Sequence, residues 1–263
     1  MLEAKAMAAK TRKGQFAPGQ IIKCVEAAIT CDDFDEGMKK ESDYFIECLV
    51  NPQREAMIHI FFGERAASKI SDIPRETPVK EIKKAGIIGS GTMGGGIAMC
   101  FANAGIPVHI IDQDEDNLKR GMSVIEKNYQ FMVNRGKMTE EMMTGVFGLV
   151  TSSLDYQDVS DCDIVIEAVY ENLELKEKIF RTLDEVVKKD AILASNTSGL
   201  NVDSIAAAVT NRPELVVGTH FFSPANIMRL LEVVRGTQSS DETMATVMSV
   251  GKKLKKASVV SLN

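Results

Sequence analysis

His220 and Glu232 are the two residues whose types and positions best suit proton transfer. His220 follows the apolar run 215–219, so it is expected at the carboxyl end of a strand, where ligand crevices of open α/β folds lie. Glu232 lies inside the largely apolar run 228–234, where a carboxylate is costly unless it is paired. Pairing would raise the basicity of the imidazole and fix its tautomer, as a general base requires. The alternative for His220 is a satisfied structural histidine.

Residues 84–96 have the pattern of a dinucleotide-binding turn. They predict a buried strand, a turn and the start of a helix, with Gly89, Gly91 and Gly94 in G-x-G-x-x-G spacing. Gly89 allows a tight turn, Gly91 lets the backbone approach a pyrophosphate, and Gly94 lets the helix pack on the strand. The free N–H groups at the helix N-terminus favour phosphate oxygens.

Asp112 lies where such a site has an acidic residue, about 20 residues beyond the glycines and directly after the strand 108–111. Its carboxylate would accept hydrogen bonds from the adenosine ribose hydroxyls. The next residues are Gln113, Asp114 and Glu115, with no nearby Arg or Lys for a 2′-phosphate, which favours NAD over NADP. The alternative is that Asp112 only caps the following helix.

Residues 195–199, Ser-Asn-Thr-Ser-Gly, follow the apolar strand 192–194. Small polar side chains at this point can line a crevice, or they can cap the helix expected from near Asn201. Ser198 together with His220 also suggests a hydrolase. However, no GxSxG elbow is present, and the glycine turn indicates a dinucleotide instead.

The elements that position these residues change in character along the chain. Residues 1–70 predict a helical segment, and residues 71–82, with two prolines, predict an extended linker. From residue 83 to 263, strands and helices alternate. This pattern predicts an α/β fold of the Rossmann type, with a doubly wound, mostly parallel sheet covered on both faces.

Within the helical segment, Pro52 is expected to open a fourth helix that runs over residues 53–70. Its apolar residues recur at helical spacing and are expected to be buried. They include Met57, Ile60 and Phe61.

Composition excludes several classes of function. The chain has 263 residues, 44% hydrophobic and 26% charged, with a formal net charge of −6, which is unsuited to binding nucleic acid or an anionic membrane. No apolar run approaches the roughly 20 residues that span a bilayer, and no targeting signal is seen. The five cysteines show no CxxC and no His at metal-ligand spacing, so we expect no metal site and buried thiols in a reducing compartment.

Several motifs together resemble one family, the NAD-dependent L-3-hydroxyacyl-CoA dehydrogenases. The sequence around His220 is closer to that of the dehydrogenase part of multifunctional fatty-acid β-oxidation enzymes. The N-terminal helices are similar to the tail of the hydratase/isomerase part and the linker of those enzymes, so the resemblance covers nearly the whole chain. The stretches that carry it are GSGTMGGGIA at 89–98, IEAVYEN at 166–172, SNTS at 195–198, GTHFFSPA at 218–225, MRLLEV at 228–233, and residues 18–27 and 61–67.

The resemblance implies a set of residues that hold NAD. These are Gly89, Gly91, Met93, Gly94, Asp112, Val169, Tyr170, Glu171, Lys176, Ser198 and Ser223. Ser223 stands where the family often has Asn, although the multifunctional branch tolerates Ser. The resemblance also implies three catalytic residues. Ser198 would contact the nicotinamide region and the substrate's 3-oxygen, His220 would remove the 3-hydroxyl proton, and Glu232 would orient His220 and stabilise its charged form.

The implied activity is that of an oxidoreductase, which converts (3S)-3-hydroxyacyl-CoA to 3-oxoacyl-CoA with hydride transfer to NAD. The alternative is a weak or silent fragment that binds NAD and acyl-CoA. The family's C-terminal helical domain, which closes the cleft and builds the dimer, is expected after residue 263, and the hydratase core before residue 1. Without these parts we expect no hydratase activity, and oligomerisation is put in question.

Location is implied by the resemblance alone. It suggests a peroxisome, with the cytoplasm as the alternative. The last residues, Ser-Leu-Asn at 261–263, are not the SKL type of peroxisomal address.

Overall fold

The computed structural model describes residues 1–209 and 211–263, and the chain divides into two compact units, Met1–Ala66 and Ala67–Asn263. The first unit is helical. Its helices are α1 (Leu2–Thr11), α2 (Ala17–Thr30), α3 (Phe34–Val50) and α4 (Pro52–Ala67). Among the described residues of the chain, no helix is long and apolar enough to cross a membrane.

The apolar side chains of α4 are exposed, so the expected burial of Met57, Ile60 and Phe61 is wrong. Their exposed fractions are 69%, 57% and 49%. All of α4 is described, and none of its residues is buried. A helical period determines which residues share a face, but burial also requires a second surface against that face.

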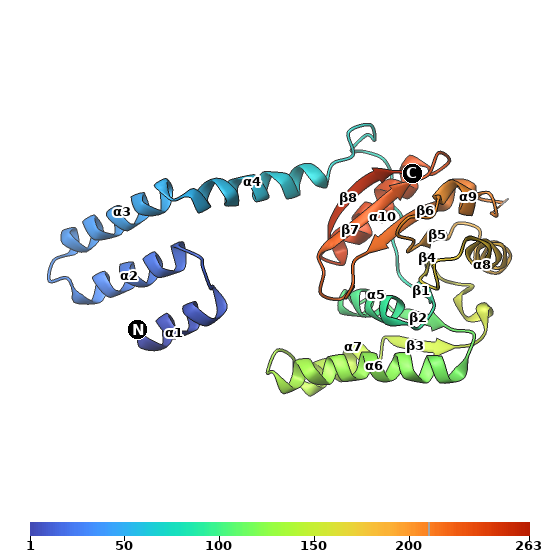
Figure 1. Cartoon of the computed structure of the whole chain (residues 1–263), viewed down its shortest axis with the longest axis horizontal. Helices are drawn as coiled ribbons and strands as arrows, with labels where there is room; N and C mark the ends of the chain where they lie inside the picture. The colour runs from blue at the N-terminus through green and yellow to red at the C-terminus, as the bar shows by residue number, and fades with distance from the viewer. Residues whose placement is uncertain (210) are drawn as a thin grey trace. The chain divides into compact units, whose positions relative to one another are not determined.

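The second unit is built on one mixed sheet, labelled in Figure 1, in which the described residues form strands in the order β3-β2-β1-β4-β5-β6-β7-β8. The first six pair in parallel, β7 is antiparallel to β6, and β8 is parallel to β7. The predicted Rossmann-type, mostly parallel fold is confirmed, because 3-2-1-4-5-6 is the order of a doubly wound dinucleotide-binding sheet. The strands are β1 (Ala85–Ile88), β2 (Val108–Ile111), β3 (Val150–Ser153), β4 (Ile164–Glu167), β5 (Ile192–Ser195), β6 (Val216–Phe221), β7 (Leu230–Arg235) and β8 (Ala257–Leu262).

Helices cover both faces of this sheet, because alternate residues of the buried strands point to opposite sides. On one face, Ile87 and Ile110 join a core with residues of α5, α6 and α10. On the other face, Ile88 and Val165 join a core with residues of α8 and α9. The helices of this unit are α5 (Thr92–Asn103), α6 (Glu115–Asn134), α7 (Glu140–Phe147), α8 (Leu173–Val186), α9 (Val202–Ala206) and α10 (Asp241–Lys253), with 3-10 turns at Tyr156–Val159 and Pro213–Leu215.

Strands β1 to β5 end level with one another at one carboxyl edge, and β6 continues three residues further, to Phe221. Ile88 of β1 is in register with Ile111 of β2 and with Glu167 of β4. Glu167 is in register with Ser195 of β5, and Ser195 with Gly218 of β6. The segments that follow these strands therefore meet at one edge of the sheet, and they include most of the predicted site residues.

Candidate active site

The glycine turn after β1 has the geometry of a phosphate-binding loop. Gly89 has a φ of 105°, a backbone conformation that residues with a side chain rarely adopt. A Cβ there would lie 2.8 Å from the carbonyl oxygen of Ala168. A Cβ at Gly94 would lie 1.8 Å from the carbonyl oxygen of Gly89. Gly91 differs, because a Cβ there would meet nothing within 4 Å. The chain itself requires glycine at 89 and 94, whereas the open space over Gly91 leaves room for a ligand.

Helix α5 begins directly after this open position. Gly91 is its N-cap residue, and Met93 lies partly buried in its first turn. The first N–H groups of an α-helix have no partner within the helix and carry partial positive charge, so they favour an anion. The turn therefore fits the pyrophosphate of a dinucleotide.

Asp112 follows β2 and contacts this same turn. One carboxylate oxygen, Oδ2, accepts hydrogen bonds from the Ser90 amide at 2.8 Å and the Ser90 hydroxyl at 2.6 Å. The alternative that Asp112 caps the next helix is wrong, because the N-cap of α6 is Asp114, which accepts a bond from the Asn117 amide. Asp112 therefore braces the glycine turn and is free of the capping role.

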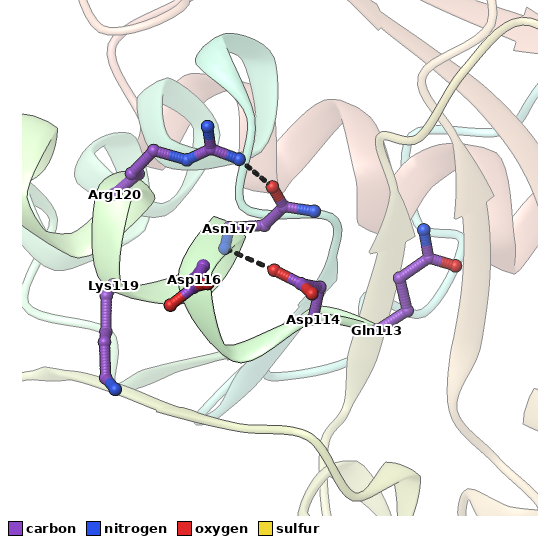
Figure 2. A pocket seen from close by; sticks show the side chains of 6 residues that line it. All are labelled: Gln113, Asp114, Asp116, Asn117, Lys119 and Arg120. Atoms are coloured by element: carbon purple, nitrogen blue, oxygen red, sulfur yellow. Dashed lines mark hydrogen bonds between the residues drawn. The ribbon is translucent and has the colours of Figure 1, made fainter.

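A pocket of about 660 Å³ opens immediately beyond Asp112, at the start of α6. The observation corrects one expectation, since basic side chains do lie close by. Lys119 and Arg120 line this pocket, and they point away from each other in Figure 2. Arg120 donates to Asn117, and Lys119 pairs with Glu115 at 2.9 Å. Both cations are thus engaged by partners on their own helix.

The segment after β4 carries three predicted cofactor residues. The Val169 amide donates to Glu167 at 2.7 Å, and Tyr170 is 85% exposed. Glu171 stands just before Asn172, which caps α8 by accepting a bond from the Leu175 amide. The cap fixes where α8 begins and so fixes where Glu171 lies.

Glu171 binds the serine loop, as we name residues 195–199. Its Oε1 accepts bonds from the Thr197 hydroxyl at 2.6 Å, the Ser198 amide at 2.8 Å and the Ser198 hydroxyl at 3.2 Å. Partial burial acts to raise the pKa of Glu171, but these bonds and the nearby Lys176 ammonium outweigh it and lower the pKa to about 2. Glu171 is therefore an anion that ties the β4 and β5 segments together.

Lys176 lies below the edge instead of on its surface. It is 0% exposed, and its Nζ lies 2.6 Å from Glu167 Oε1 and 3.3 Å from Glu171 Oε2. The other Glu167 oxygen accepts the Ser195 hydroxyl at 2.7 Å. The sequence analysis included Ser195 in the polar stretch 195–199 but gave Glu167 no role. A carboxylate in the apolar strand 163–167 was the available signal, the same signal that singled out Glu232.

His220 and Glu232 are in contact, as the sequence predicted. They are register partners in the antiparallel pair β6–β7, and His220 Nδ1 lies 2.7 Å from Glu232 Oε2. Their side chains are 20% and 36% exposed, so the pair is reachable from outside. Since a carboxylate only accepts, Nδ1 carries the proton and Nε2 keeps a lone pair that can take one.

The serine loop is also joined to the strand that carries His220. Asn196 accepts a hydrogen bond from the Phe221 amide at 2.8 Å, and the Phe222 ring lies 4.4 Å from the His220 ring. Ser223 lies two residues beyond the end of β6 and is exposed. Ser198 lies in the loop that follows β5, and His220 lies near the end of the adjacent parallel strand β6.

Comparison with known proteins agrees with this geometry. Residues 84–263 match a family model described as 3-hydroxyacyl-CoA dehydrogenase, NAD binding domain. The peroxisomal bifunctional enzyme of Homo sapiens is 38% identical over 251 residues, which is 94% of this chain and 34% of that protein. Beyond residues 84–263, this match extends into the N-terminal helices.

Solved structures give the same likeness. The (S)-3-hydroxybutyryl-CoA dehydrogenase of Ralstonia eutropha is 36% identical with a TM-score of 0.68, covering 70% of this chain and 64% of that one. The dehydrogenase part of multifunctional enzyme 1 from C. elegans is 28% identical with a TM-score of 0.67, covering 78% and 48%. The chain spans about a third of the length of the peroxisomal bifunctional enzymes that it matches.

Proposed function

The chain belongs to the 3-hydroxyacyl-CoA dehydrogenase family, and residues 84–263 form the NAD-binding domain of that family; on this premise we propose that the chain oxidises (3S)-3-hydroxyacyl-CoA to 3-oxoacyl-CoA. The observation that carries the proposal is the 2.7 Å contact between His220 and Glu232 at the sheet edge that holds the glycine turn. The substrate class is an acyl thioester of coenzyme A, as the name of the family states.

In this reaction the chain's own residues move one proton. Bound NAD supplies the acceptor for the hydride that leaves C3 of the substrate. His220 Nε2 takes the proton of the 3-hydroxyl group as the carbonyl forms. Glu232 holds the other ring nitrogen and stabilises the imidazolium by its negative charge. Ser198, on the adjacent strand end, contacts the 3-oxygen.

The cofactor is held by segments that follow β1 and β2 at its adenosine end and by segments that follow β4 and β5 at its nicotinamide end. The amides at the start of α5 bind the pyrophosphate over the open space at Gly91. Asp112, which is held in place by hydrogen bonds from Ser90, accepts hydrogen bonds from the adenosine ribose hydroxyls. The segment Val169–Glu171 and the serine loop line the nicotinamide side. Ser223 lies on that side as a further polar group.

The test is NADH consumption with acetoacetyl-CoA, which runs the reaction in reverse. We expect turnover by the wild-type chain and its loss in His220→Gln, while NADH binding, measured by calorimetry, is kept. Equal turnover in both would exclude His220 as the proton-transfer residue.

A second candidate function is binding of NAD and acyl-CoA without turnover. The peroxisomal bifunctional enzymes that this chain matches are about three times its length, so binding and turnover are measured separately. Tight NAD binding with no turnover at any acyl chain length would select this alternative. Absence of NAD binding would exclude both candidates.

We also propose that the N-terminal helices correspond to the tail of a hydratase/isomerase part and that the protein works in peroxisomes. The match to the human peroxisomal bifunctional enzyme, which extends into these helices, supports both statements. Co-localisation of the tagged protein with a peroxisomal marker tests the location, and a cytoplasmic distribution would contradict it.

A further inference from the structure

The last residues of β6 are held on the β5 side by a side chain, because β5 itself ends earlier. Strand β5 pairs with β6 only as far as Gly218, and β6 runs on to Phe221. We propose that Asn196 is a positioning residue for the proton transfer: its side chain sets the spacing between Ser198 and His220, so that both reach the 3-oxygen of the substrate. The inference rests on the proposed oxidation and deepens it.

The Asn196 side chain takes the place of the strand residues that β5 lacks. Its Oδ1 accepts a hydrogen bond from the Phe221 amide at 2.8 Å. That amide belongs to the peptide bond between His220 and Phe221, so the contact acts on the backbone of the proposed base. Among the hydrogen bonds of the described residues, it is the only one that joins residues 196–199 to residues 219–222.

Both partners of this hydrogen bond are themselves fixed. The Asn196 amide donates to the Glu167 carbonyl oxygen at 2.8 Å, which continues the pairing of β4 with β5 by one residue. Phe221 is 2% exposed and belongs to the core on one face of the sheet. A hydrogen bond between two anchored groups fixes the distance between the segments that carry them.

The route through this bond from Ser198 to His220 is short. Ser198 lies two residues after Asn196, and His220 lies one residue before Phe221. Both side chains are proposed to act on one oxygen atom, Ser198 by contact and His220 Nε2 as the base. A misplacement of about 1 Å in a reacting group can cost about 100-fold in rate, so the spacing that Asn196 sets bears on the chemical step.

The other contacts of the site do not pass through Asn196. The glycine turn and Asp112 follow β1 and β2, and Glu232 binds His220 from β7. Loss of the Asn196 oxygen should therefore spare cofactor binding and the pairing of the imidazole, and should lower kcat. This combination separates a positioning role from a general loss of structure, which would weaken NADH binding as well.

The experiment measures kcat and KM with acetoacetyl-CoA, the calorimetric Kd for NADH and the melting temperature in Asn196→Leu and Asn196→Asp. Leu is close to Asn in size but has no acceptor, so we expect kcat to fall at least about tenfold. KM, the Kd for NADH and the shape of the pH–rate profile should stay those of wild type. Asp keeps an acceptor oxygen for the Phe221 amide and should restore most of the wild-type kcat. Asn134→Leu, the same change at the exposed end of α6, is the matched control and should keep wild-type kcat.

A further variant, Asn196→Ala, keeps the test decisive if the Leu variant does not fold. It removes the same oxygen without adding an apolar branch and should show the same fall in kcat. Wild-type kcat in a folded variant that lacks the oxygen would overturn the positioning role, and so would parallel losses of kcat and NADH affinity. An Asp variant as slow as the Leu variant would count against it too. A wild-type chain that binds NADH without turnover would instead refute the proposed oxidation, and this role with it.

Discussion

His220 and Glu232 face each other across the antiparallel pair β6–β7, and this pairing determines which nitrogen of the imidazole can act as a base. The 2.7 Å bond occupies Nδ1 and leaves Nε2 for the substrate. The adjacent strand β5 is parallel, so a second polar segment ends at the same edge. Strand β7, which pairs antiparallel with β6, thus places the Glu232 carboxylate beside His220 on the side opposite β5.

Glu232→Gln should lower turnover with acetoacetyl-CoA and NADH about 100-fold. The amide oxygen can still accept a hydrogen bond from Nδ1–H, but it carries no charge to stabilise the imidazolium, so the defect lies in the chemical step. NADH affinity should stay unchanged. Glu242→Gln, an exposed change on α10, is the control, and a Glu232 variant that turns over as fast as this control would contradict the role.

Much of this fold could be predicted because local signals agree with the final packing. The run before the glycine turn, the turn itself and the strand that ends at Asp112 each have a distinctive pattern, and each forms the predicted element. The contact between His220 and Glu232 followed from the cost of a carboxylate in an apolar strand. The same argument applied to Glu167 would have found its buried contact with Lys176.

What could not be predicted depends on neighbours instead of on local pattern. The edge strand β3 is short and polar, and only its Val150 is buried, so the sequence offers no strand signal there. The last strand, β8, gains its pairing from β7, and the face of α4 has an apolar period with nothing buried. Strand pairing and the burial of a helix face both depend on other parts of the molecule, which the local sequence does not reveal.

Two glycine substitutions should separate folding from binding. Gly94→Ala would place a Cβ 1.8 Å from the Gly89 carbonyl oxygen, so the backbone must shift and the melting temperature should fall. Gly91→Ala meets no atom within 4 Å and has an ordinary extended backbone, so the fold should be kept while NADH affinity falls about tenfold as the methyl group fills the ligand space. Thermal melts and NADH titrations distinguish the two. Wild-type NADH affinity in Gly91→Ala would contradict the phosphate-binding role.

Asp112→Asn should weaken ADP binding about tenfold, because an amide offers one acceptor oxygen where the carboxylate offers two. The remaining oxygen can still accept from Ser90, so the turn should keep its shape. Asp114→Asn is the matched control, since Asn caps a helix as well as Asp does. Calorimetry with ADP provides the measurement, and equal Kd values for the two variants would count against the ribose contact.

Glu171 should make the stability of the chain depend on acid pH. Its pKa falls from the ordinary value near 4.5 to about 2 in the folded chain. A group with a lowered folded pKa stabilises the fold above its unfolded pKa, and this stabilisation is lost as pH falls toward the folded pKa. The free energy of unfolding should therefore differ most between wild type and Glu171→Gln near neutral pH. The difference should shrink between about pH 4.5 and 2.

Urea unfolding at several pH values in this window measures that difference directly. Glu174→Gln removes an exposed carboxylate from the first turn of α8 and corrects for the loss of one negative charge. After this correction, a gap between wild type and Glu171→Gln that narrows on acidification supports the clamp on the serine loop. A gap that stays constant with pH would mean that the Glu171 carboxylate gains nothing from Thr197, Ser198 and Lys176, and the clamp would then be excluded.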